Sequence, residues 1–579
     1  MRKKLLLVHL TVITFASLLA AQDKSQRDVE RKIEDSVNVP QIATGFESKK
    51  RTLPDLERIG VDMAKQRPLT LREAITLALD NSKDIEVSRQ NVKGAEYDLQ
   101  AARGFFEPRF NGQSYFEKSK TPNVSIFSTN QSTTNKSLVS SIGLQSFLPK
   151  FGSVLNLNVN NQRVETNNPI AILSPQENTN LSFSFSQPIL RGRSIDQARR
   201  TIEIAKKNLS LTDAQFRQKA IEVITNVQRA YWDLAFALRN LQVQIDTVKD
   251  ARQQLEHNRR LMEEGQLAPI DVVAAETQVA NFEQNIYDAL NLVQVTENNL
   301  KILIAKNKDD DIWSESIVPV DPVELQAPRI TLSDALQVAL ENRPELELNN
   351  LQREINAIDQ GFYKDQTKPQ IDLTASYTSA GIGGSQNPGF RSPFPLPCQT
   401  APSSPACQQQ LSLINALTGS SLSDVFANRY PTFRIAVTVS LPLFGNQTQK
   451  AQLGKSLVEA EKIKLQREQI EQLIQIDVRN ALQVLRTAEA RLRSASIARE
   501  NSQKQYESEQ RKLDAGQSDI YRVLERQTAL AIARSNELKA QIDLNKAIAE
   551  FQRAVGNALQ VNNVQTTNLR LKSNEISKR

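Results

Sequence analysis

The chain has 579 residues, of which 39% are hydrophobic and 24% are charged, with a formal net charge of +7 at pH 7. This composition is ordinary for a water-soluble protein and argues against a bundle of membrane-spanning helices. If Arg2, Lys3 and Lys4 leave with a signal peptide, the charge falls to +4, which gives no evidence for nucleic acid as a partner.

The first 21 residues have the pattern of a secretory signal peptide. The basic residues 2–4 precede an apolar run over residues 5–19, and the small residues Ala20 and Ala21 follow. A membrane anchor is the alternative, but the run is shorter than the roughly 20 residues that span a bilayer, and it contains His9. We therefore expect export of the protein and cleavage near Ala20 or Ala21.

A duplicated unit begins after a polar N-terminal segment. Thr70 and Glu73 have the spacing of a capping box at a helix start, and Thr331 and Asp334 repeat this spacing 261 residues later. In each copy the pattern predicts a helix of roughly 30 residues that ends before a proline. The expected order is an irregular extension at 22–68, a first repeat at 69–305, a linker at 306–329, a second repeat at 330–556 and a polar tail at 557–579.

Each predicted helix leads into a region of alternating apolar and polar residues, at 109–188 and 370–441. Examples are Leu181, Phe183 and Phe185, which alternate with serines. Such strands have one apolar and one polar face, and they suit either a small sandwich or a transmembrane barrel. Segments 104–190 and 361–445 hold 10 and 9 of the 32 aromatic residues, which favours contact with lipid.

The two strand regions differ in content. The first has an additional predicted hairpin near residues 138–162, and the second has a long loop over 379–427 that contains Cys398 and Cys407. In an exported protein a local disulfide is the favoured interpretation of two cysteines nine positions apart, and two free thiols or a partial metal site are the alternatives.

Two very long helical hairpins follow the strand regions. Outgoing helices are predicted over 194–263 and 447–514, and after turns at Gly265 and Gly516 the returning helices end near residues 305 and 555. At a rise of 1.5 Å per residue each outgoing helix is about 100 Å long, which excludes a single globular core.

A heptad seam supports these hairpins. Apolar residues recur at gaps of four and three in both copies, displaced by 251 residues: Val223, Val227, Ala230, Leu234, Ala237 and Leu241, and then Ile474, Val478, Ala481, Leu485, Ala488 and Leu492. This period is typical of a coiled coil, and the small residues indicate close packing with other helices.

This order of parts resembles the TolC-like outer membrane efflux family. The resemblance covers roughly residues 69–305 and 330–556. The segments most typical of the family are the turn at 440–444 and the hairpin tip at 265–272. It implies a duplicated α+β membrane protein in which a homotrimer forms an outer-membrane β-barrel, with about four strands from each chain. A hollow periplasmic α-helical barrel would continue the duct.

The resemblance also implies the partners and the site. Family members export drugs, toxins or proteins by docking onto an inner-membrane pump through a periplasmic adaptor. By position, the adaptor-binding and gate residues at the hairpin tips are Gly265, Ile270, Asp271 and Val272 in the first copy and Gly516, Arg522, Val523, Leu524 and Glu525 in the second. The best-known members have two aspartates at the second tip, whereas this chain has Arg522 and Glu525, so an Arg522–Glu525 pair or an Arg522–Asp271 contact is the expected lock.

Little in the sequence suggests catalysis. After signal cleavage His257 is the one histidine left, which disfavours a histidine triad and excludes a histidine metal cluster within one chain. The sequence contains no P-loop and no dinucleotide fingerprint, and we interpret the acidic run at 309–311 as a solvated linker. We expect neither enzyme activity nor a cofactor. A periplasm-spanning coiled-coil spacer and a passive porin are the alternative functions.

Overall fold

The computed structural model describes residues 57–123, 130–392, 396–441 and 445–565. The predicted signal peptide, most of the N-terminal extension, the core of the turn at 440–444 and the end of the C-terminal tail lie outside the described residues. The chain divides into two units, Met1–Glu57 and Arg58–Arg579, and the second unit is described below.

The second unit begins with a parallel strand pair that the sequence analysis did not predict. Strand β1 (Asp62–Leu69) lies in the stretch expected to be irregular, and it pairs in parallel with β6 (Glu315–Pro319) in the expected linker. A parallel pair joins segments that are far apart in sequence, so no local sequence pattern predicts this pairing.

A buried ion cluster fixes this strand pair to the first hairpin. Arg58 Nη1 lies 2.7 Å from Glu297 Oε2, and Glu297 Oε1 accepts a hydrogen bond from the Ile317 amide at 2.8 Å. Lys301 Nζ lies 3.6 Å from Glu297 Oε1 and donates to the Trp313 carbonyl oxygen at 3.0 Å. Burial lowers the pKa of Lys301, against the attraction of Glu297. The cluster therefore depends on Glu297, whose carboxylate contacts both cations.

The predicted helix at the start of each repeat is divided in two. Helices α2 (Leu71–Asn81) and α3 (Lys83–Arg103) form the first copy, and α6 (Leu332–Asn342) and α7 (Pro344–Gln366) form the second. Both starts agree with the capping pattern, since Thr70 and Thr331 each accept the predicted backbone hydrogen bond at 3.2 Å.

The break between the two helices has a clear cause in the second repeat. Arg343 has an extended backbone, with φ −71° and ψ 122°, because the ring of Pro344 disfavours a helical conformation for the preceding residue. Ser82 takes a similar conformation without a proline. There, the side chain of Asn81 donates to the Ile304 carbonyl oxygen at 2.9 Å, a tertiary contact at the end of α2.

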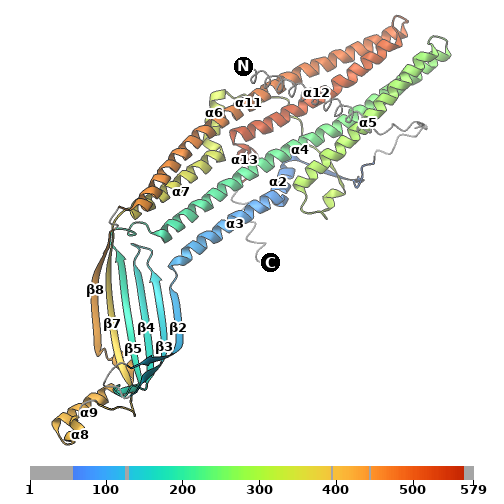
Figure 1. Cartoon of the computed structure of the whole chain (residues 1–579). Coiled ribbons are helices and arrows are strands. Elements are labelled where there is room, and N and C mark those ends of the chain that lie inside the picture. The colour runs from blue at the N-terminus through green and yellow to red at the C-terminus, as the bar shows by residue number, and fades with distance from the viewer. Residues whose placement is uncertain (1–56, 124–129, 393–395, 442–444, 566–579) are drawn as a thin grey trace, which may run out of the picture. The chain divides into compact units, whose positions relative to one another are not determined.

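The strand regions form one antiparallel sheet (Figure 1). Its order is β2 (Arg109–Pro122), β3 (Ser132–Phe147), β4 (Val154–Thr166), β5 (Leu173–Pro188), β7 (Gln370–Gln386) and β8 (Tyr430–Ser440). The additional hairpin, β3–β4, is a full member of the sheet. The described residues thus form six strands of this sheet, two more than the four or so that the resemblance implies for the contribution of each chain to a barrel.

The two helical hairpins are present as predicted. They consist of α4 (Gln197–Glu263) and α5 (Pro269–Ile304), then α11 (Gln447–Asp514) and α12 (Ile520–Val555). The outgoing helices have 67 and 68 residues, or about 100 Å each. Most seam residues are buried, and Leu234 and Leu485 belong to the two largest apolar clusters. Figure 1 shows both hairpins extending from the end where the sheet is attached.

The long loop of the second repeat contains three short helices, α8 (Pro397–Thr400), α9 (Pro405–Leu417) and α10 (Ser421–Phe426). Cys398 and Cys407 are joined by a disulfide. The remaining elements are α13 (Ala558–Val561) and single 3-10 turns at Gly104–Phe106 and Asp311–Trp313. No helix in the described part of the chain is long and apolar enough to cross a membrane.

Candidate functional site

The first hairpin tip is a tight reversal between α4 and α5. Gly265 has φ +76°, and the Gln266 amide donates to the Leu261 carbonyl oxygen at 2.8 Å, which is the left-handed ending that favours glycine. Asp271 accepts a hydrogen bond from the Ala268 amide at 3.2 Å. In this chain Asp271 therefore stabilises the start of its own helix.

The second tip repeats the reversal with different polar contacts. Gly516 has φ +68°, and Asp519 caps α12 by accepting from the Arg522 amide at 3.0 Å. The Arg522 side chain pairs with the same residue, with Nε 3.3 Å from Asp519 Oδ2 and both side chains more than half exposed. Within the chain, the partner of Arg522 is thus Asp519, and neither expected partner, Glu525 or Asp271, takes this place.

A carboxylate at the end of α11 holds the second turn in place. Glu509 accepts a hydrogen bond from the Ser518 hydroxyl and lies 3.2 Å from Lys512 Nζ. These contacts lower the pKa of Glu509, the Ser518 bond most strongly. Glu509 therefore links the last turns of α11 to the turn that precedes α12.

The predicted tip residues fall into two groups. Val272, Val523 and Leu524 are buried, and the last two pack with Ile520 in a small cluster that Ala274 of the first tip contacts. These three residues stabilise the tips and offer little surface to a partner. The exposed members are Gly265, Ile270, Gly516, Arg522 and Glu525, with Asp271 half-buried.

Two exposed apolar side chains at the tips were missed. Val273 is 52% exposed and Tyr521 is 68% exposed, compared with 66% for Ile270. Ile270 and Val273 are three positions apart in α5, which places them on one helix face. That spacing was a signal that could have identified Val273 from the sequence.

Polar contacts join the two hairpins near their tips. Gln278 Nε2 donates to Thr528 Oγ1 at 2.9 Å, and His257 Nε2 lies 3.2 Å from Asp514 Oδ1. Farther from the tips, Arg534 Nη1 lies 3.3 Å from Asp250 Oδ2. Such partly exposed contacts each contribute little free energy, so they can break and re-form without loss of the apolar seam.

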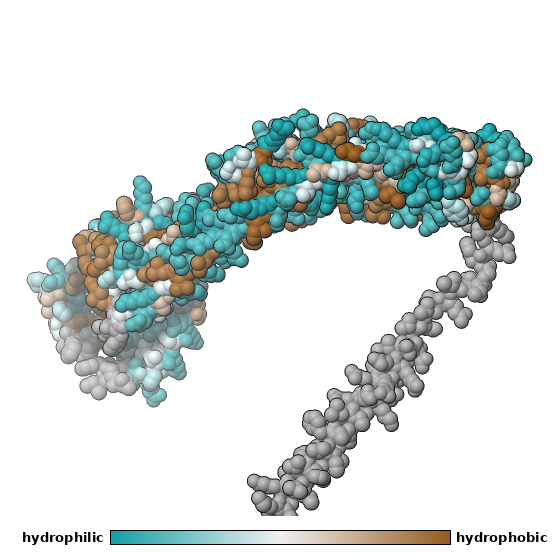
Figure 2. Space-filling model, turned by 90° about the horizontal axis from the view of Figure 1, so that it is seen from above, coloured by the Kyte–Doolittle hydropathy of each residue, from teal (hydrophilic) through white to brown (hydrophobic). Residues whose placement is uncertain are grey.

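The sheet presents two chemically different faces. In an antiparallel sheet, residues directly opposite one another share a face. One such row crosses all six strands with exposed apolar side chains: Phe110, Leu144, Leu157, Phe183, Tyr377 and Phe433. The next row, on the other face, is polar or glycine: Asn111, Gly143, Asn158, Ser182, Thr378 and Thr432. Figure 2 shows apolar surface in brown at the sheet end of the molecule.

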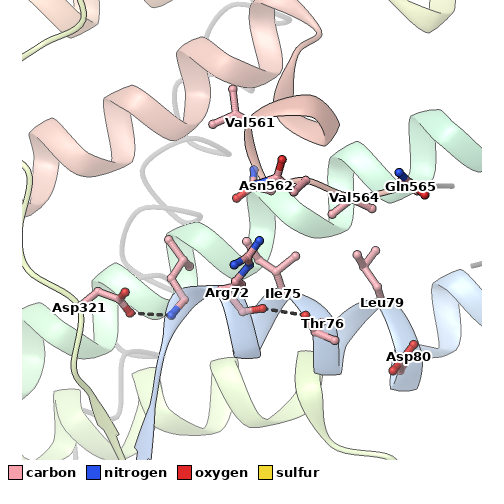
Figure 3. Close-up of a pocket in the computed structure, with 12 residues that line it drawn as sticks. Arg72, Ile75, Thr76, Leu79, Asp80, Asp321, Val561, Asn562, Val564 and Gln565 are labelled. Atoms are coloured by element: carbon pink, nitrogen blue, oxygen red, sulfur yellow. Dashed lines mark hydrogen bonds between the residues drawn. The ribbon is translucent and has the colours of Figure 1, made fainter. Parts of the chain in front are cut away.

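An open pocket lies beside α2 (Figure 3). It has a volume of about 540 Å³, and α2, Asp321 and residues 561–565 line it. The Asp321 carboxylate accepts a hydrogen bond from the Leu71 amide at 2.6 Å and another from the Tyr231 hydroxyl. Burial raises the pKa of Tyr231, so this hydroxyl stays protonated and donates. Asp321 therefore has a structural role in joining α2 to α4.

No group of three or more His, Cys, Asp or Glu side chains is arranged to hold a metal ion within the residues that the structure describes. The chemical features of the described surface are thus the two-faced sheet and the two polar tips.

Solved structures share this fold. The chain is similar to the Campylobacter jejuni CmeC outer membrane channel, with 15% identity, a TM-score of 0.56 and coverage of 84% of this chain and 86% of that one. It is also similar to the open state of the Neisseria gonorrhoeae MtrE outer membrane channel, with 15% identity, a TM-score of 0.55 and coverage of 84% of this chain and 89% of that one. These likenesses confirm the duplicated fold of helices, strands and long hairpins.

The sequence itself matches a family model. The model described as "Outer membrane efflux protein" matches residues 141–306 and 335–557, which include most of both predicted repeats. A comparison with curated proteins found no match. The chain therefore belongs to the outer membrane efflux protein family, whose members are channels of the outer membrane that extend into the periplasm.

Proposed function

We propose that the protein is the exit duct of a tripartite efflux or type I secretion system, which works as a homotrimer and conducts substrates passively from an inner-membrane pump. The single observation that best supports this role is the continuity of a two-faced sheet with helices of about 100 Å. A spacer needs the helices but not the exposed apolar sheet face. A porin needs the sheet but not the long hairpins.

In this proposal the hairpin tips have two tasks. The exposed apolar side chains of Ile270, Val273 and Tyr521 form a contact surface for a periplasmic adaptor. Arg522, Asp519 and Glu525 form the polar entrance, which stays closed until the adaptor engages. The weak contacts between the hairpins support this role, since a gate must open at a low cost in free energy.

Single-channel conductance of detergent-extracted trimers in a planar bilayer tests the proposal. We expect a low current from the wild type and a higher current from Arg522→Ala or Glu525→Ala, because each removes a charge at the entrance. The matched control is Arg493→Ala, which removes an exposed arginine from an ion pair within α11, away from the tip.

The outcomes separate the three functions. A large, constant current from the wild type would favour a porin, and trimers without any current would favour a spacer. Trimers in which the tip variants and the control conduct equally would keep the duct and reject the assignment of the gate.

A further inference from the structure

One continuous sheet joins the two repeats. β5 of the first repeat pairs directly with β7 of the second, so four strands and two strands form one continuous surface. Six strands are too few to close a barrel, for which the observed minimum is about eight. Among the described residues, β2 and β8 each pair on one side only.

The two edges are suited to each other across a pair of neighbouring copies. Because the six strands alternate in direction, β8 of one copy runs antiparallel to β2 of the next. The strands have 14 and 11 residues, and a transmembrane strand needs about 9 to 11. Phe110 on β2 and Phe433 on β8 belong to the same apolar row, so the apolar face continues across the seam.

The exposed apolar residues of the six strands form a belt, and the strands are inclined to this belt, as barrel closure requires. We call the end of the sheet that adjoins α3 and α11 the helix end. Phe110 lies at the helix end of β2, with Phe116 farther along the strand, whereas on β8 Phe433 lies away from the helix end and Val437 and Val439 lie near it. The same row therefore meets one border of the belt on β2 and the other border on β8.

We propose that three copies close an eighteen-stranded barrel through antiparallel pairing of β8 with β2 of the next copy, and that this barrel admits bulky hydrophilic solutes that a twelve-stranded one would exclude. The inference rests on the proposed trimeric duct and specifies its cargo by size and polarity. Barrel diameter grows roughly linearly with strand number, and barrels of about 16 to 18 strands leave an aqueous channel.

The polar face of the sheet fits such cargo. It is lined mainly by Asn, Gln, Ser and Thr, and its charged residues on the six strands are Arg109, Glu117, Asp372 and Arg434. Two positive and two negative charges leave the lining neutral. The barrel therefore selects by width and hydrogen bonding more than by charge.

Cysteine cross-linking in the membrane tests the proposed pairing of β8 with β2 of the next copy. Ser114→Cys on β2 would be combined in turn with Phe433→Cys, Ile435→Cys and Val437→Cys on β8, all on the apolar face, and oxidised by a lipid-soluble catalyst. We expect covalent oligomers from at least one of these pairs and none from the single variants. If Val159→Cys on β4 cross-links to the β8 cysteines instead, the barrel has twelve strands and the proposal is wrong.

A second measurement needs no substitution. Electron cryomicroscopy of the wild-type trimer counts the strands directly, and a barrel of fewer than eighteen would overturn the proposal even if the cysteine variants failed to assemble. Absence of cross-links from both the β2–β8 and the β4–β8 cysteine pairs would likewise reject the proposed pairing between copies.

The width has its own test. In conducting trimers, graded neutral polyethylene glycols should enter up to a diameter that falls by about a third when residues 132–166 are deleted, because this removes β3 and β4. An unchanged limit would show that the barrel does not set the width. Trimers that conduct no current would contradict the proposed duct, while electron cryomicroscopy would still count the strands of the barrel.

Discussion

The two repeats have nearly identical helices and very different strands. Their outgoing helices have 67 and 68 residues and their returning helices have 36 each, whereas the first repeat supplies four strands and the second supplies two. The seam explains the first fact, since two coiled hairpins that pack along their length must keep the same period. Antiparallel pairing explains the second, because an added hairpin leaves the direction of both edges unchanged.

The repeats also differ where the hairpins meet the N-terminal strand pair. Glu297 and Lys301 correspond, 251 residues later, to Ile548 and Gln552. The first repeat thus has a buried charge cluster that receives Arg58, and the second has an apolar residue and a neutral one. The duplication kept the helix and changed the interior contact.

Among the differences between the two repeats, the loss of the buried charge cluster should reduce the stability of the protein most. Glu297→Ala leaves Arg58 and Lys301 buried without their carboxylate, which should cost about 3–5 kcal/mol of stability. Thermal unfolding of the purified protein measures the loss, and limited proteolysis should show faster cleavage near residues 57–69. Glu283→Ala on the same helix, which removes a partly exposed ion pair, is the control. Equal losses in both variants would contradict a special role for the cluster.

The shared seam is tested by matched truncations. Leu234 and Leu485 occupy equivalent positions and are 0% and 1% exposed. Each change to alanine should cost about 2–5 kcal/mol by loss of buried contacts and creation of a cavity. Thermal unfolding of both variants should show similar losses. A clear inequality would mean that the two seams differ in packing although their sequences have the same period.

The loop found only in the second repeat provides a smaller effect. Helix α10 lies against β7, and a Cβ atom added at Gly381 would lie against the Ser421 carbonyl oxygen. Gly381→Ala should therefore displace α10 at a cost of about 1–3 kcal/mol, and hydrogen exchange should increase over residues 421–426. The control is Gly361→Ala in α7, where an added Cβ meets nothing within 4 Å. Unchanged exchange in Gly381→Ala would show that the loop is not packed on the strand.

The tips should give the smallest effect. Asp519→Ala removes the cap of α12 and should cost about 0.5–2 kcal/mol, seen as faster proteolysis near Gly516. Glu525→Ala changes an exposed charge in the same helix without removing a cap, so its proteolysis rate should equal that of the wild type. A faster rate in Glu525→Ala would indicate that this residue, too, stabilises the second tip.

Much of the fold could be predicted because its signals are local. Period two in the strands, the 4-3 spacing of the seam and the glycines at both tips each depend on residues a few positions apart. Duplication strengthened these signals, since every long helix was seen twice. From these features the helical hairpins, the two-faced strands and the place of the tips followed.

Tertiary structure decided what depends on distant partners. The parallel pairing of β1 with β6 joins distant segments beside the Arg58–Glu297 ion pair, and β3 and β4 belong to one sheet because each pairs with a strand on both sides. At the tips, Val523 and Leu524 are buried against Tyr506 and Leu513 of α11 and Ala274 of the other hairpin. Arg522 pairs with Asp519, which also caps the helix. Sequence alone determined which segments are helices or strands and which of their faces are apolar. The burial of a particular side chain and its polar partner depended on chain segments that come close only in the folded protein.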